Sequence, residues 1–398
     1  MSRQILAGRV APLGTTIFSE FSALALQHRA VNLGQGFPDF DGPEAVKEAA
    51  RKAITDGVNQ YAPSPGLREL RVAIAEHGAR FHGHTGIDPD TMVTVTSGAT
   101  EAILCVMLGL VDPGDEVVLF EPFYDSYDAN IRFLEATPRY VPLRPPDADH
   151  PTWWFDRDEV RAAFGPRTRL LILNTPHNPT GKVFTREELE FLAALCAEHD
   201  TRVLADEVYE HIVFSPARHV RVATLPSLAE RTVTVSSGGK TFSLTGWKVG
   251  WCIAPPPLRD AVQRAHQFVT FATASPLQAA MAAALRLPDS YFEELGHQYR
   301  ARRERLLTGL EQAGLKAYAP EGSYFIMADV SGRGFPHDVA FCRHLVTQVG
   351  VAAIPPSVFY GPEHRHLGEG MARFAFCKTD GVLDEAVRRL KAGLARAP

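Results

Sequence analysis

Short runs of β-favouring residues alternate with helical patterns between residues 90 and 272, and this alternation constrains the fold most strongly. Seven runs read as strands, at 92–96, 116–120, 137–141, 169–173, 202–205, 232–235 and 249–253. Helical patterns lie between most of them, for example at 100–110 and 186–199, and another follows at 257–272. Such alternation is typical of βαβ units with a mostly parallel sheet, whose strands are apolar throughout because both faces are covered. We predict an α/β domain with a mostly parallel seven-stranded sheet covered by helices.

The segments on either side of this alternation have a different pattern. Residues 1–40 read as an irregular arm with one helix at 17–25, and two further helices are predicted at 45–54 and 67–81. In the last third, helices are predicted at 288–312, 336–349 and 382–397, and strands at 324–329, 351–354 and 373–377. We therefore predict a large domain at 41–285 and a smaller α+β domain at 286–398, which the arm at 1–40 joins.

Composition excludes several classes of function. The 398 residues carry 41 basic and 46 acidic side chains, a net charge of −5 that argues against nucleic acid as the main partner. No apolar run reaches the length of a membrane span, and residues 1–10 lack the apolar core of a secretion signal, so we expect a cytoplasmic protein. The five cysteines are scattered without a CxxC pair, and no HExxH motif occurs among the 15 histidines. We expect reduced, buried cysteines and no metal site.

Residues 236–251, SSGGKTFSLTGWKVGW, contain two lysines eight residues apart, Lys240 and Lys248. Small residues allow the backbone to approach a ligand closely. A lysine that is desolvated and near another cation has a lowered pKa and can form a Schiff base with an aldehyde. The second lysine could hold a phosphate as a point charge. Taken alone, the stretch is also consistent with a loop that carries two solvated lysines.

Two further motifs follow predicted strands. Residues 96–102, TSGATEA, run from a strand into a helix, whose free amides and positive dipole end suit a phosphate. The alternative is a Ser/Thr cap with Glu101 in the first turn. In residues 174–181, NTPHNPTG, Asn178 can donate to a phenolate-type oxygen, although an Asn-Pro sequence is also typical of a purely structural turn.

Asp206 comes directly after an apolar strand in residues 203–209, VLADEVY, where a carboxylate without a partner would be costly. A protonated ring nitrogen would be a fitting partner. Tyr209, three residues later, would lie on the same side of a helical turn. The alternative is that Asp206 caps a helix and binds no ligand.

These motifs all follow strands, and in an open parallel sheet ligands bind at the carboxyl ends of the strands. Together they offer a phosphate site, a carboxylate for a pyridinium, two donors for a phenolate and a lysine for an aldehyde. Pyridoxal phosphate has all of these groups. The motifs therefore predict a pyridoxal 5'-phosphate site.

The chain resembles the class I/II aminotransferases of pyridoxal-phosphate fold type I over nearly its whole length. Within them it is most similar to the kynurenine aminotransferase, glutamine transaminase K and methionine aminotransferase group. That finer resemblance is carried by residues 35–40 (QGFPDF), 178–184 (NPTGKVF) and 239–250 (GKTFSLTGWKVG). Lys248 is more particular to this chain, because many relatives have arginine there.

The resemblance implies a role for each residue around the cofactor. Lys240 would bond to the cofactor aldehyde and Asp206 would pair with the pyridine nitrogen. Asn178 and Tyr209 would hydrogen-bond the phenolic oxygen, with Tyr209 counted among the catalytic residues, and Tyr124 would stack on the ring. The phosphate would be bound by Gly98, Ala99, Thr100, Ser237 and Lys248.

For the substrate, the resemblance implies that Arg373, in residues 372–376 (ARFAF), binds the α-carboxylate through two hydrogen bonds. Without the resemblance Arg373 would read as a surface arginine on a strand. Gly36 and Asn178 would lie beside the substrate. Tyr61 and Phe271 would reach the site of the neighbouring subunit, because the family is dimeric.

Two positions depart from the group's pattern and argue against a strict kynurenine preference. In the group, a ring-bearing residue often follows the glycine of the phosphate site, and Thr100 stands at that position here. Some members have a histidine after the aromatic residue matched by Phe271, and Ala272 stands at that position here. The aromatic residues expected to form the pocket are Phe18, Phe37, Tyr61, Tyr124 and Phe271. They suggest amino donors with aromatic, sulfur-containing or glutamine side chains, such as kynurenine, glutamine, methionine and phenylalanine.

The reaction implied is transfer of an amino group to a 2-oxo acid by a ping-pong mechanism, with Lys240 as the acid–base that moves the α-proton. Two alternatives stay open. A β-lyase that acts on cysteine S-conjugates or cystathionine would share the same carbanion chemistry, and release of pyruvate and ammonia would reveal it. A non-catalytic, ligand-sensing regulator could share the fold, but the chain retains Lys240 and shows no appended DNA-binding segment.

Overall fold

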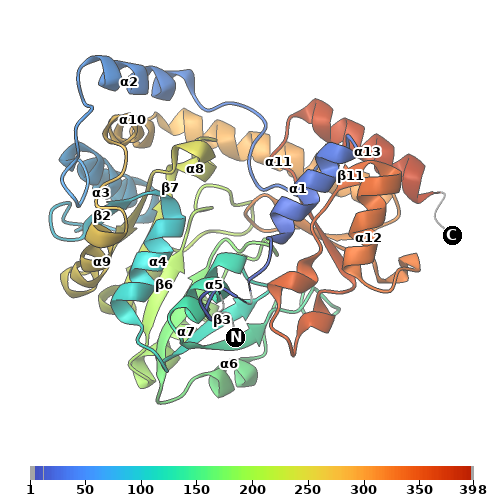
Figure 1. Cartoon of the computed structure of the whole chain (residues 1–398), viewed down its shortest axis with the longest axis horizontal. Helices are drawn as coiled ribbons and strands as arrows, with labels where there is room; N and C mark the ends of the chain where they lie inside the picture. The colour runs from blue at the N-terminus through green and yellow to red at the C-terminus, as the bar shows by residue number, and fades with distance from the viewer. Residues whose placement is uncertain (1–4, 12, 396–398) are drawn as a thin grey trace.

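The computed structural model describes residues 5–11 and 13–395, which form a large sheet with its helices and a smaller group of helices and short strands (Figure 1). Among the described residues, no helix is long and apolar enough to cross a membrane. All five cysteines are buried and free, as predicted.

The central sheet has seven strands, and all seven were predicted to within one or two residues. Their spatial order is β2 (Val93–Thr96), β8 (Gly250–Ile253), β7 (Thr232–Ser237), β6 (Arg202–Asp206), β5 (Thr168–Asn174), β3 (Glu116–Glu121) and β4 (Thr137–Pro142). Strand β8 runs antiparallel to both of its neighbours, and the other paired strands are parallel. The mostly parallel α/β sheet is therefore confirmed.

Helices cover both faces of this sheet. Along β5, Leu170 and Ile172 pack toward α4 (Gly98–Leu110), α5 (Asp125–Phe133) and α9 (Pro256–Val269). Leu171 and Leu173 point to the opposite face, toward α6 (Arg157–Ala163) and α7 (Arg186–Glu198). Three further helices pack over the end formed by β2 and β8, namely α2 (Glu44–Thr55), α3 (Arg68–His82) and α10 (Ser275–Leu285). This two-sided burial explains the uninterrupted apolar strands.

The remaining elements share a separate core. Strand β10 (Phe325–Asp329) lies between β9 (Lys316–Tyr318) and β12 (Met371–Ala375) in an antiparallel sheet. Its helices are α1 (Ile17–Gln27), α11 (Asp289–Gln312), α12 (Asp338–His344) and α13 (Asp380–Leu394). The N-terminal arm meets this group through β1 (Val31–Asn32), which pairs in parallel with β11 (Val351–Ala352). The domain boundaries at residues 40 and 285 stay predictions.

Several predicted elements differ in detail. The helix predicted at 336–349 consists of α12 and a π-helical turn, Leu345–Val349, and it starts later because His337 caps it by accepting from the Ala340 amide. The strand predicted at 351–354 ends at Ala352, and the one predicted at 373–377 spans 371–375. Strand β9 has only three residues and was not predicted. The predicted end of the last helix, Ala397, lies outside the described residues.

Candidate active site

A cavity of about 320 Å³ lies where β5, β6 and β7 end and where β10 and β12 approach the large sheet. Twelve of the fourteen predicted site residues line it: Gly36, Gly98, Ala99, Thr100, Tyr124, Asn178, Asp206, Tyr209, Ser237, Lys240, Lys248 and Arg373. The carboxyl ends of parallel strands meet at one edge of a sheet, which brings together residues far apart in the sequence.

Lys240 lies in the single-turn helix α8 (Gly238–Thr241), directly after β7. It is half-buried, and its Nζ lies 3.4 Å from the Gly36 carbonyl oxygen, to which it donates. Burial lowers the pKa of Lys240, and the charges of Lys248 and Arg373 act in the same direction. A lysine with a lowered pKa is more often in the neutral, nucleophilic form at neutral pH. This setting matches the desolvated lysine near other cations that the sequence predicted.

Asp206 ends β6 and is 4% exposed. Its Oδ2 accepts a hydrogen bond of 2.6 Å from the Tyr127 hydroxyl, and its Oδ1 accepts one of 3.3 Å from the Val208 amide. Burial raises the pKa of Asp206 to about 6 despite these two bonds. Neither donor carries a charge, so the carboxylate is suited to a positively charged partner in the cavity.

No helix follows Asp206, which corrects two interpretations of this segment. Residues 208–211 form turns, so Asp206 is not a helix cap, and Tyr209 is not placed by a helical turn. Tyr209 nevertheless lines the cavity, and its ring packs edge-on against Tyr324 with centroids 5.0 Å apart. The turns at 208–211 follow directly after Asp206, whose carboxylate accepts from the Val208 amide, and they bring Tyr209 back toward the cavity.

Arg373 lies on β12 and is 1% exposed, so it is not a surface arginine. Its Nη1 donates to Asn178 Oδ1 at 3.1 Å, and its Nη2 donates to the Gly34 carbonyl at 2.8 Å. The guanidinium also lies over the Phe325 ring, 4.2 Å from its centroid. Among the described residues its Nε has no hydrogen-bond partner. A buried guanidinium with spare donors facing a cavity can bind a carboxylate.

The N-terminus of α4 forms the opposite wall of the cavity. Ser97 does not cap this helix, because its hydroxyl bonds to the Thr273 hydroxyl at 2.8 Å, while the Glu101 side chain accepts from the Ser97 amide. Gly98 has a φ of +78°, and a Cβ there would lie 3.2 Å from Cε of Lys248. Lys248 Nζ in turn donates to the Thr100 hydroxyl at 3.2 Å. Free helix amides beside a lysine can bind an anion.

Two predicted site residues do not line the cavity. Tyr61 is 85% exposed and Phe271 is 46% exposed, and their rings pack edge-to-face with centroids 5.4 Å apart. Of the other aromatic residues predicted for the pocket, Phe18 and Tyr124 line the cavity, whereas Phe37 does not. Phe18 lies over the Arg373 guanidinium, 5.0 Å away.

Sequence reasoning missed Tyr127 and Phe325. Tyr127 follows Tyr124 by three residues at the start of α5, and this helical spacing could have placed both on the cavity side. Phe325 lies on β10 and packs under Arg373 only because β10 and β12 are paired. No local sequence signal indicates that pairing.

Comparisons with known proteins match one family over most of the chain. The profile of the family described as aminotransferase class I and II matches residues 28–390. A probable N-succinyldiaminopimelate aminotransferase of Mycobacterium tuberculosis is 46% identical over 388 residues, covering 96% of this chain and 97% of that protein. The kynurenine–oxoglutarate transaminase of Dictyostelium discoideum is 41% identical over 409 residues, covering 95% of this chain and 94% of that protein. A solved Escherichia coli structure with a methionine aminotransferase function matches with a TM-score of 0.91 and 41% identity, covering 98% and 100%.

Proposed function

Because the chain belongs to the class I and II aminotransferases, we propose that it uses pyridoxal 5'-phosphate to move an amino group from an L-amino acid with a neutral side chain to a 2-oxo acid. The donors proposed have aromatic, sulfur-containing or glutamine-type side chains, including kynurenine, glutamine, methionine and phenylalanine. The observation that carries the proposal is the convergence of Lys240, Asp206 and Arg373 on one cavity.

The chemistry of the cavity fits pyridoxal phosphate. Asp206 is a buried carboxylate with only neutral donors, which a pyridinium nitrogen would complement. Lys240 provides an amine of lowered pKa for the aldehyde. The phosphate would be held by the amides of Ala99 and Thr100 with Ser237 and Lys248, while Asn178 and Tyr209 would bond the phenolic oxygen and Tyr124 would lie against the ring. When bound, the cofactor supplies an aldehyde for the amino group and a ring that accepts the electron pair left when the Cα–H bond breaks.

The residues of this chain would then orient the substrate and move the proton. Arg373, fixed by Asn178 and Gly34, would hold the α-carboxylate and so direct the Cα–H bond. The Lys240 amine would take the proton from Cα and return it to the former aldehyde carbon of the cofactor, across the nitrogen from Cα, as one acid–base on one side of the substrate. Asp206 would keep a proton on the ring nitrogen, which stabilises the negative charge that develops. Phe18 would exclude water above Arg373.

The charges in the cavity support a neutral side chain on the donor. Among the described lining residues, the cationic side chains are Lys240, Lys248 and Arg373. Each already has a task, at the aldehyde, the phosphate and the α-carboxylate. A second carboxylate on the donor would therefore be desolvated without a dedicated cation, which costs binding energy. Apolar or amide side chains avoid this cost.

N-succinyldiaminopimelate is a second candidate donor, favoured by the 46% identity to the mycobacterial protein named for it. This donor carries carboxylates beyond the one that Arg373 would bind. It would therefore require a cation from outside the described lining residues. Its turnover at a rate above that of methionine, phenylalanine, glutamine and kynurenine would select this candidate.

We also propose a homodimer with shared sites. Tyr61 and Phe271 lie together outside the cavity, with exposed fractions of 85% and 46%, and Phe268 is 87% exposed. Large aromatic side chains of this kind are typical of a surface that a second copy covers. The mass in solution tests the dimer, and loss of activity on Tyr61→Ala without loss of the dimer would support its contribution to the neighbouring site.

The decisive experiment is an absorbance spectrum of the purified protein, recorded before and after each amino donor is added separately. We expect a cofactor band that shifts toward the amino form with at least one of the neutral donors. Lys240→Ala should lose the shift and serves as the control. A wild-type protein without such a band after addition of pyridoxal phosphate would contradict the proposal. Pyruvate and ammonia released from a cysteine S-conjugate would indicate β-lyase activity.

A further inference from the structure

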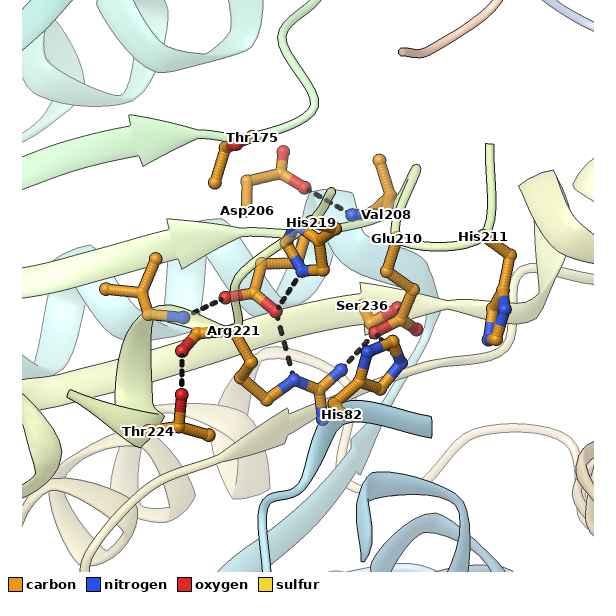
Figure 2. A network of polar contacts seen from close by, with 12 residues as sticks. His82, Thr175, Asp206, Val208, Glu210, His211, His219, Arg221, Thr224 and Ser236 are labelled. Atoms are coloured by element: carbon orange, nitrogen blue, oxygen red, sulfur yellow. Dashed lines mark hydrogen bonds and ion pairs between the residues drawn. The ribbon is translucent and has the colours of Figure 1, made fainter. Parts of the chain in front are cut away.

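Three histidines and a glutamate gather outside the catalytic cavity, behind the segment that follows β6. His77 and His82 come from the C-terminal part of α3, whereas Glu210 and His211 come from the turns after Asp206. One ligand atom from each residue lies within 4.8 Å of all the others. Figure 2 shows His82 beside Glu210, with Ser236 and Arg221 on the other sides of that carboxylate. The proposed transamination uses none of these four side chains.

The ligand atoms of the cluster face one another, so hydrogen bonds between them could be exchanged for bonds to a metal. His77 Nδ1 lies 3.3 Å from the Leu285 carbonyl, so it is the donor, and its Nε2 lone pair faces His211 Nε2 at 2.8 Å. His82 Nε2 lies 3.1 Å from Glu210 Oε2, yet within the described part of the chain it has no hydrogen-bond partner. His77 thus has the usual geometry of a metal-binding histidine, in which one ring nitrogen donates to a backbone carbonyl and the other is directed at the ion.

The charges around the cluster favour a divalent cation. Glu207 and Glu210 contribute two negative charges, and Arg221, which donates to both, contributes one positive charge. The net charge near the cluster is therefore −1 when the histidines are neutral.

We propose that His77, His82, His211 and Glu210 bind one zinc ion per chain. Three imidazole nitrogens and one carboxylate oxygen form a closed tetrahedral set of the kind found in structural zinc sites. Tetrahedral ligand atoms about 2.0–2.2 Å from zinc are roughly 3.3–3.5 Å apart, so the cluster would contract modestly around the ion. His82 and His211 are less buried as residues than His77 and Glu210.

The ion would act as a structural link. It would tie α3 to the turns at 208–211, which begin at Asp206 and contain Tyr209. The Glu210 carboxylate also accepts from Ser236, next to Ser237 of the cavity, so the link would steady the wall behind the catalytic residues. It would take no part in the chemistry, because none of its four ligands lines the cavity.

The other cluster of potential metal ligands, Glu101, Cys105 and His266, is of a different kind. Both ring nitrogens of His266 are already engaged, with Glu101 Oε1 at 2.6 Å and the Ser64 carbonyl at 2.8 Å. Burial raises the pKa of the Cys105 thiol well above its ordinary value, which disfavours the thiolate that a metal requires. No ring nitrogen of this cluster is left without a hydrogen bond, whereas His82 Nε2 has none among the described residues, so the cluster provides an internal comparison.

The first test measures zinc bound to the holoenzyme without amino substrates, after equilibration with Zn²⁺ and passage through metal-free buffer. We expect one zinc per chain in wild type and in two controls, His150→Gln, at an exposed histidine, and Cys105→Ser. His82→Gln and His211→Gln each remove one ligand while keeping a polar side chain of similar size, and should weaken zinc binding more than about 100-fold. Wild type without bound zinc, or equal binding by wild type and both variants, would overturn the proposal.

The second test separates loss of the site from loss of the fold. Zinc at about 100 times its dissociation constant should raise the melting temperature of wild type by about 5 °C, and a chelator should reverse the shift. His82→Gln and His211→Gln should melt at a temperature that zinc does not change. The chelated wild type should keep its cofactor band and its spectral response to donors. A wild-type melting temperature indifferent to zinc would refute the site even if the variants misfold.

Discussion

The buried carboxylates at the end of β6 differ in the direction in which their surroundings change the pKa. Asp206 faces the cavity with only neutral donors, and burial raises its pKa to about 6. Glu210 lies four residues further on and is also buried, but the charge of Arg221 holds its pKa well below the ordinary value against the effect of burial. The pKa of Glu207, whose carboxylate bonds both His219 and Arg221, is lowered in the same way.

The difference in pKa distinguishes Asp206, which has no cationic partner in the part of the chain that the structure describes, from Glu207 and Glu210, which pair with Arg221. Burial without a counter-charge is costly, so a fold keeps such a group only where something else gains from it. At Asp206 the gain would come from a cationic ring bound in the cavity. At Glu207 and Glu210 the partners are part of the chain, so these residues hold the segment that carries Asp206.

The largest effect on stability is expected from removing the partner of the paired carboxylates. Arg221→Met would leave Glu207 and Glu210 buried without their guanidinium, and we expect a loss of about 3–5 kcal/mol in unfolding free energy. Urea unfolding of the cofactor-free protein in the presence of a chelator measures it. Arg144→Met is the matched control, because its pair with Glu159 is partly exposed and should be worth less than about 1 kcal/mol. Similar losses in both variants would break the comparison.

Asp206→Asn should affect function rather than folding. The asparagine keeps the size of the side chain but cannot hold a proton on a ring nitrogen by charge. We expect the half-reaction with the best donor to slow by about 10²–10³-fold. Single-turnover spectroscopy of the holo form measures this rate. Unfolding of the cofactor-free variant should show no loss of stability, and a large loss there would mean that Asp206 is structural, like Glu210.

The sequence predicted the sheet and most of the cavity because both depend on local patterns. Seven apolar runs matched seven strands, and Lys240, Asp206, Asn178 and Gly98 each follow one of them. Tertiary contacts were not predictable in this way. Tyr127 reaches Asp206 across 79 residues of chain, and the turns at 208–211 replaced the expected helical turn. The expectation of no metal site rested on local motifs, which read His82 as part of a Gly-flanked loop. The grouping of His77, His82 and His211 depends on the fold, which alone brings these two segments together.

The pH dependence of the cofactor-free protein sharpens the comparison. Native Asp206 has a pKa of about 6 against an ordinary value of 3.8, so the folded protein binds a proton that the unfolded chain has released between these values. Through this group, stability falls as pH rises across that window, by about 3 kcal/mol in total. Glu207 has the opposite sign, since its lowered pKa gives stability that is lost as pH falls. Subtracting the curve of Asp206→Asn from that of wild type removes the shared contribution of Glu207, and a flat difference would contradict the assignment.

The smallest effect is expected from Tyr127→Phe, which removes the 2.6 Å hydrogen bond to Asp206 and leaves the ring in place. That bond lowers the pKa of Asp206 against burial, so its loss should raise the pKa by about 1–2 units. Carboxyl NMR of the cofactor-free protein can follow this titration, with Tyr140→Phe, whose hydroxyl bonds Asp128, as the control. If a bound pyridinium is the true partner of Asp206, the cofactor should then hold the carboxylate ionised in both proteins. Wild type and Tyr127→Phe should therefore differ in their cofactor-free titration and converge once the cofactor is bound, whereas an equal difference in both forms would argue that Tyr127 alone is the partner.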